Sequence, residues 1–224
     1  MTKTCTIVGA LALLATTGIA TANTVTFTRG ITGTSGGEFI GSYTGEITGN
    51  RVSFCLELNE TVNPNGSTVY DYTLATGDYG ATGGGVAGAG VGGNDPLSAA
   101  TAYLFQQWML GKATNGAQGI VNTVANSRAL QNTIWYLEQE LELSSLNSAR
   151  QAEVTALLAT VPNTYSIVPG ADDFNLLAGG GQIRVVNITR NGNDFQSQLT
   201  LIPLPTASGM ALAGLALVGT RRRR

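Results

Sequence analysis

Two blocks of strand-like sequence enclose a block of helical sequence, and this order constrains the fold of the 224-residue chain more than any other feature. Alternating apolar and polar residues predict strands before residue 75 and a hairpin after residue 180. Helical periodicity predicts three helices between them. We therefore expect an α+β fold, in which β-sandwich or barrel-like strands carry an inserted helical subdomain. The predicted strands are 24–29, 38–48, 51–58, 68–74, 182–189 and 195–202, and the predicted helices are 95–111, 127–143 and 148–159.

Local signals fix several ends of these elements. Asn191-Gly192 predicts the turn of the last hairpin, because both positions of a type I′ turn need a positive φ. Asp95 with Pro96 and, farther on, Ser127 are the expected N-terminal ends of the first two helices. A glycine-rich stretch, residues 77–94, is expected to be a loop.

The N-terminal end has the features of a secretory signal peptide, residues 1–22. Lys3 supplies a positive charge, residues 7–15 form an apolar run, and Ala20-Thr21-Ala22 is a small-x-small cleavage site. Cys5 lies inside this leader. The middle of the chain, residues 23–202, is long enough for one domain with a sizeable core.

The C-terminal end, residues 203–224, is predicted to be a sorting and anchor segment. It combines a proline motif with a short apolar run, 207–218, and a basic end: Pro203, Pro205, Arg221, Arg222, Arg223 and Arg224. The run is shorter than the roughly 20 residues of a full membrane span, and basic residues directly after it favour a cytoplasmic tail. The alternative is an Ala/Gly/Leu helix packed on the domain.

This C-terminal segment resembles the PEP-CTERM sorting signal of Gram-negative bacteria, although Leu204 stands where the family has an acidic residue. The resemblance implies processing by an exosortase-type enzyme, and contact with a membrane through the segment before processing. It also implies a final location in the cell envelope, on the outer surface or in the extracellular matrix.

Composition excludes several functions. The chain has 12 basic and 14 acidic residues; without Lys3 and the four terminal arginines, residues 23–202 carry a charge of about −7, which argues against nucleic-acid binding. The chain has no histidine, so a serine–histidine triad is excluded and a zinc site is not expected. No paired-acid motif indicates a hydrolase. We expect neither a metal, a cofactor nor an enzyme activity.

Cys55 is the only cysteine outside the leader, in the strand motif Phe54-Cys55-Leu56-Glu57. A lone cysteine in an exported protein is a free thiol, an intermolecular disulfide or a sulfur bonded in another way. Cys55 lies off the apolar face of its predicted strand, which suits a site better than a core position. An inert buried thiol is the alternative.

The second motif is Leu130-Gln131-Asn132-Thr133-Ile134-Trp135, at the expected opening of a helix. We hypothesise that the Cys55 sulfur is bonded to the side-chain carbonyl carbon of Gln131 as a thioester. Well-oriented groups lower such a barrier by roughly 7–11 kcal/mol. Free N–H groups of the first helical turn are expected to stabilise the oxyanion. Trp135 and Phe54 are suitable shields against water. An ordinary helix-surface amide is the alternative for Gln131.

Together the two motifs resemble those of bacterial surface thioester domains, over about residues 37–200. Two positions depart from the family pattern: Glu57 stands where Asp or Asn is usual, and Thr133 replaces a small apolar residue. The resemblance implies that a lysine amine of a surface or matrix protein attacks the thioester and becomes bonded to Gln131, with no turnover. Lys112 is the only lysine outside the leader, which would limit reaction within the chain. The alternative is a non-reactive structural component of an exopolysaccharide matrix or envelope.

Overall fold

The computed structural model describes residues 22–32, 37–75, 79–82, 94–171, 173–174 and 182–202. The signal peptide up to residue 21 and the whole C-terminal segment, with Pro203, Pro205 and the four arginines, lie outside these residues. Most of the glycine-rich stretch 77–94 does so as well. Within the described residues, no helix is both long and apolar enough to cross a membrane.

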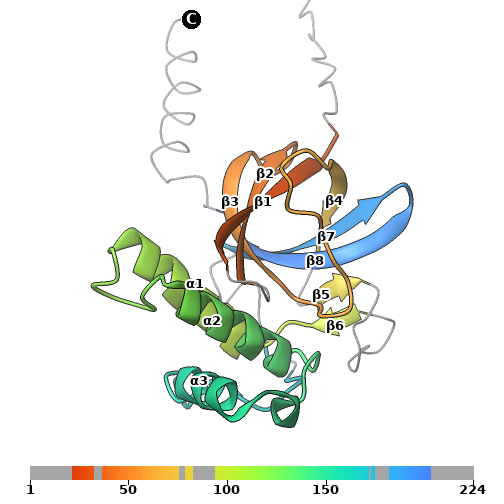
Figure 1. The fold of residues 1–224 in the computed structure, drawn as a ribbon. Coiled ribbons are helices and arrows are strands. Elements are labelled where there is room, and N and C mark those ends of the chain that lie inside the picture. The colour runs from red at the N-terminus through yellow and green to blue at the C-terminus, as the bar shows by residue number, and fades with distance from the viewer. Residues whose placement is uncertain are drawn as a thin grey trace, which may run out of the picture.

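Six antiparallel strands form a closed barrel in the order β1-β2-β3-β8-β7-β4 (Figure 1). Pairing of β1 with β4 closes it, and pairing of β3 with β8 joins the N-terminal strands to the C-terminal hairpin. The strands are β1 (Thr24–Thr32), β2 (Gly37–Thr44), β3 (Gly49–Cys55), β4 (Tyr70–Leu74), β7 (Ile183–Arg190) and β8 (Asn193–Leu201). At the predicted hairpin turn Asn191 and Gly192 have φ of 54° and 75°, as a type I′ turn requires.

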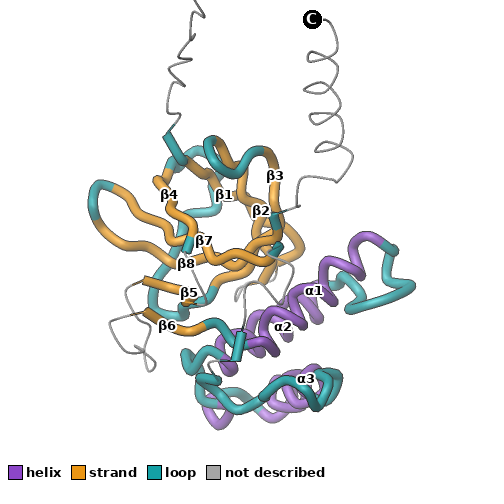
Figure 2. Tube along the Cα trace, turned by 180° about the vertical axis from the view of Figure 1, so that it is seen from behind, coloured by secondary structure: helices purple, strands orange, loops and turns teal. Residues whose placement is uncertain are grey.

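The helices are α1 (Ala99–Ala113), α2 (Val124–Leu137) and α3 (Ser148–Leu158), with a 3-10 turn η1 (Leu143–Ser145) before α3. They lie in sequence between the barrel strands β4 and β7, so the expected α+β fold with an inserted helical subdomain is confirmed. Figures 1 and 2 show the three helices together outside one end of the barrel. Helix α2 contacts β1, β2 and β3. Two short strands, β5 (Tyr79–Thr82) and β6 (Asn94–Pro96), pair with each other, so the ends of the predicted glycine-rich loop are strands.

The predicted starts of the first two helices are wrong by about one turn. Ser98 caps α1, and Thr123 caps α2 by accepting a hydrogen bond from the Asn126 N–H. The Ser127 hydroxyl instead accepts a hydrogen bond from the Glu38 N–H at 2.9 Å. Ser and Thr both make good N-caps, and here a contact with β2 determines which of the two serves.

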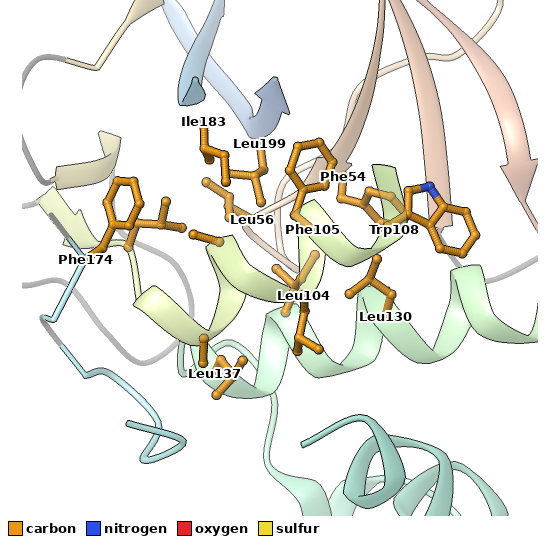
Figure 3. Close-up of a cluster of buried hydrophobic side chains, with 14 of the residues drawn as sticks. Phe54, Leu56, Leu104, Phe105, Trp108, Leu130, Leu137, Phe174, Ile183 and Leu199 are labelled. Carbon is orange, nitrogen blue, oxygen red and sulfur yellow. The ribbon is translucent and has the colours of Figure 1, made fainter. Parts of the chain in front are cut away.

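Two separate apolar cores hold the molecule together. One fills the barrel and includes Phe27, Tyr43 and Ile188. The other joins the barrel to the helices, and Figure 3 shows its side chains converging between β3, β8, α1 and α2. Phe54 of β3 meets the Trp108 ring edge to face at a centroid distance of 5.5 Å. The helices are thereby fixed against the strand that carries the cysteine.

Candidate functional site

Cys55 is the last residue of β3, next to the residue that packs against the helices. It pairs with Gln198 of β8 in the antiparallel register and is 2% exposed. Its neighbour Phe54 is fully buried in the core between barrel and helices. Because successive strand residues point to opposite faces, the packing of Phe54 directs the Cys55 side chain away from that aromatic contact.

The Gln131 carboxamide is bound to the main chain of Cys55 by two hydrogen bonds. Its Oε1 accepts from the Cys55 N–H at 3.1 Å, and its Nε2 donates to the Cys55 carbonyl at 2.7 Å. Gln131 has no exposed surface. The fold therefore brings together the two residues that the sequence motifs single out, although they are 76 positions apart.

The position of Gln131 in its helix differs from the prediction. Helix α2 begins at Val124, so Gln131 lies about two turns inside it. N–H groups at that depth bond to carbonyls of the preceding turn and are not free. The expectation that first-turn N–H groups act as oxyanion donors is therefore wrong. The donor that does meet the Gln131 side-chain oxygen is the Cys55 N–H, at 3.1 Å.

The Cys55 sulfur has a polar neighbour that the sequence did not reveal. Gln198 Nε2 lies 3.3 Å from Sγ and donates to it. Burial raises the pKa of the Cys55 thiol to about 12; the hydrogen bond from Gln198 lowers it, and the nearby Glu57 carboxyl raises it further. The free thiol is therefore neutral and protected at physiological pH.

Glu57, the predicted supporting residue, is 1% exposed and lies against β8. Its Oε2 accepts from the Ser197 N–H at 2.7 Å, and its main-chain carbonyl accepts from Gln196 Nε2. Burial raises the pKa of the Glu57 carboxyl to about 8; the Ser197 hydrogen bond lowers it, and the carboxyls of Glu60 and Glu140 raise it. Glu57 is therefore mainly protonated at neutral pH.

The two predicted shields lie on different sides of the site. Phe54 is enclosed by Phe105 and Trp108. Trp135 lies one helical turn after Gln131 and is 9% exposed. It lines an open cavity of about 290 Å³ together with Leu58, Asn132, Leu141, Leu146 and Arg150. Trp135 thus lies at the edge of this cavity, on the same helix as Gln131.

Lys112 of α1 is held by an ion pair with Glu38 of β2. Its Nζ lies 2.9 Å from both carboxylate oxygens of Glu38, which also accepts from Trp108 Nε1 at 2.7 Å. Among the described residues no cluster of acidic or cysteine side chains has the arrangement of a metal site.

No protein-family model and no curated protein sequence matches the chain. A comparison with solved structures finds similarity to the N-terminal thioester domain of the fibronectin-binding protein SfbI from Streptococcus pyogenes. The TM-score is 0.41 at 13% sequence identity, over 83% of this chain and 95% of that one. A TM-score of this size is too low to transfer residue roles, so any function must rest on the geometry of Cys55 and Gln131.

Proposed function

We propose that this chain is an exported domain in which Cys55 and Gln131 form an internal thioester for covalent attachment to amine-bearing surface or matrix proteins. The observation that carries the proposal is the pair of hydrogen bonds between the Gln131 carboxamide and the Cys55 main chain. They fix an acyl group beside the one cysteine that would remain after removal of the leader. The motif resemblance and the predicted leader and sorting segment support display on the envelope or in the matrix of a Gram-negative bacterium.

Bond formation needs no redox partner. The sulfur attacks the Gln131 carbonyl carbon, an S–C bond forms, the C–N bond breaks, and the thiol proton leaves on ammonia. The Cys55 N–H that donates to Oε1 stabilises the negative charge of the tetrahedral intermediate. Holding both groups in one geometry supplies most of the remaining acceleration.

During capture of a partner the sulfur is the leaving group and an amine is the nucleophile. A lysine amine of the partner attacks the same carbon, an N–C bond forms, the C–S bond breaks, and one amine proton passes to the sulfur. The product is an isopeptide bond to Gln131 and a free Cys55. Each domain reacts once, so the chemistry is attachment and not enzymatic turnover. The hydrogen-bonded ion pair of Lys112 with Glu38 limits reaction with the domain's own lysine.

A second candidate function is a passive crosslinked component of the envelope or matrix. The burial of both groups favours it, because Cys55 is 2% exposed and Gln131 is 0% exposed. A partner amine reaches Gln131 only if side chains around the site move. The two candidates differ in one property, the reactivity of the bond toward amines.

The first experiment measures the intact mass of residues 23–202. We expect a protein one ammonia lighter than its sequence, with Cys55 resistant to alkylation until the protein is treated with amine or base. Cys55→Ala and Gln131→Ala should each have the full mass of their own sequences. The exposed Gln118→Ala variant is the matched control and should keep the ammonia loss. A wild-type protein of full sequence mass with an alkylatable thiol would exclude the thioester.

The second experiment separates attachment from passive crosslinking. The domain is incubated with methylamine at mildly basic pH, and the Gln131 peptide is analysed by mass spectrometry. Methylamide at Gln131 together with one newly titratable thiol supports attachment. A persistent thioester with no adduct after days identifies a structural crosslink.

A further inference from the structure

We propose that Gln198 is the positioning residue of this chemistry: its Nε2 donor holds the Cys55 sulfur, and its Oε1 acceptor receives the N–H of the departing ammonia or incoming amine. The inference rests on the proposed function, because it concerns the same bond. It assigns a role to a residue that neither sequence motif contains. It also gives the departing or entering nitrogen an acceptor in addition to the Cys55 carbonyl, to which Gln131 Nε2 donates in this structure.

Register and burial fix the position of Gln198. It lies directly opposite Cys55 in the β3–β8 ladder and has no exposed surface. Its Nε2 lies 3.3 Å from Sγ and also 3.3 Å from the Gln196 carbonyl oxygen. A carbonyl accepts and cannot donate, so the amide nitrogen and not the amide oxygen must face it. This second contact orients the amide with its N–H groups toward the sulfur.

The oxygen of the same amide is a buried acceptor without a partner. Most buried polar groups are hydrogen-bonded, so an orphan acceptor next to the predicted reacting sulfur needs a physical reason. Both nitrogen species of the proposed chemistry, ammonia and a primary amine, bring N–H donors. An acceptor beside the sulfur suits either of them. The nitrogen of the intact Gln131 amide donates to the Cys55 carbonyl, so Gln198 Oε1 stays available for the ammonia as it departs or the amine as it enters.

The Gln198 Nε2 donor has a separate role, which concerns the charge on the Cys55 sulfur. When the sulfur attacks, and again when it leaves during capture, negative charge develops on Sγ inside a buried site. Burial opposes this charge. A hydrogen bond to the charged form of a group favours that form. The Gln198 donor therefore assists both directions, whereas the Cys55 N–H acts on the oxygen of the intermediate.

The test compares Gln198→Leu with Thr200→Val. Thr200 lies two residues along the same strand, is fully buried, and donates to the Val52 carbonyl at 2.9 Å, so its variant also loses one buried hydrogen bond. We expect Gln198→Leu to slow thioester formation after refolding and methylamine addition by about tenfold, the effect of one net hydrogen bond. Thr200→Val should stay within about twofold of wild type, since loss of one ordinary buried bond affects stability alone.

A spectroscopic readout separates positioning from folding. In the Gln131→Ala background the thiol is free, and its infrared S–H band reports the environment of the sulfur. Adding Gln198→Leu should shift that band, and adding Thr200→Val should not. If Gln198→Leu does not fold, Gln198→Met, which keeps a long flexible side chain without a donor, replaces it in both measurements.

The outcomes are distinguishable. A wild-type domain of full mass removes both the proposed function and this inference. A wild-type thioester combined with unchanged rates in Gln198→Leu overturns the inference alone. Methylamine found on the peptide that contains Gln198, and not on that of Gln131, also overturns it, because Gln198 would then be the acyl group itself.

Discussion

Glu38 and Glu57 are equally buried, at 1% exposure each, yet their surroundings are opposite. Glu38 receives two hydrogen bonds from the Lys112 ammonium and one from Trp108 Nε1. Glu57 receives one from the Ser197 N–H and faces two further carboxyls, Glu60 and Glu140. Two equally buried carboxyl groups therefore have opposite electrostatic surroundings in this fold.

The two carboxyl groups also lie in different parts of the molecule. The Glu38 carboxylate joins β2 to α1 through its ion pair with Lys112. Glu57 lies two residues beyond the cysteine and keeps a proton whose pKa is raised to about 8, first of all by burial. Titratable groups shifted in this way gather at functional sites more often than elsewhere. The comparison therefore favours the Cys55 end of β3, and not the Lys112 contact, as the place to test for reactivity.

The largest expected loss of stability comes from removing the Glu38 carboxylate, which is paired with Lys112. Glu38→Ala would leave the buried Trp108 Nε1 and the 29%-exposed Lys112 ammonium without their acceptor. Removal of one partner of a fully buried pair costs about 3–5 kcal/mol, which is the upper limit for this half-buried one. Urea unfolding of residues 23–202 measures it. The exposed Glu46→Ala is the control, expected within about 0.5 kcal/mol of wild type. A loss below about 1 kcal/mol for Glu38→Ala would show that the pair contributes no more than a surface contact.

The second prediction concerns Glu57, the carboxyl that faces Glu60 and Glu140, and the dependence of stability on pH. The folded pKa of Glu57, about 8, lies above its ordinary value of 4.5. Between these values the unfolded chain releases the proton and the folded one keeps it, so the free energy of unfolding falls as pH rises and levels off above 8. Glu57→Gln removes this loss and keeps an acceptor for Ser197.

We therefore expect Glu57→Gln to match wild type near pH 4.5 and to exceed its stability by ~2–3 kcal/mol at pH 9. Urea unfolding at both pH values measures the difference. Cys55→Ala serves as the common background, so that thioester formation does not differ between the proteins. Equal stabilities at pH 9 would place the Glu57 pKa near its ordinary value.

Features that depend on neighbouring residues could be predicted from the sequence. The Asn191-Gly192 turn follows from local backbone preferences, and helix α3 starts at Ser148 as expected, where Asn147 supplies the cap. The start of α2 could not be predicted in this way. Thr123 and Ser127 are both good caps, and only the contact between Ser127 and Glu38, 89 positions away, separates them.

The candidate site, too, could be predicted only where it depends on local sequence motifs. Two motifs identified Cys55 and Gln131, and the fold places them in contact. The missing partner was Gln198, because the β3–β8 register that puts it opposite Cys55 joins residues 143 positions apart. The run Gln196, Ser197, Gln198 offered one signal: three polar residues in a strand whose apolar alternation fails there. All three are buried in the structure.

The smallest expected effect concerns a charge pair whose cation is as exposed as Lys112 but whose carboxylate, unlike that of Glu38, is partly exposed. Arg128 and Glu153 join α2 to α3 at 2.7 Å, with side chains 28% and 31% exposed. Partly exposed ion pairs are worth about 0.2–1 kcal/mol, because water already solvates both charges. A double-mutant cycle of Arg128→Met and Glu153→Gln should give a coupling of about 0.5 kcal/mol.

Salt provides the control for this last prediction. A solvated pair is screened at molar salt, where the Debye length is about 3 Å, so the coupling should fall toward zero in 1 M sodium chloride. The cost of Glu38→Ala should change less under the same conditions, because the Glu38 carboxylate and the Trp108 ring are buried, although the Lys112 side chain is 29% exposed. A coupling between Arg128 and Glu153 above about 2 kcal/mol, or one insensitive to salt, would mean that exposure does not separate the two pairs. The difference between the two ion pairs would then depend on their geometry and not on solvent exposure.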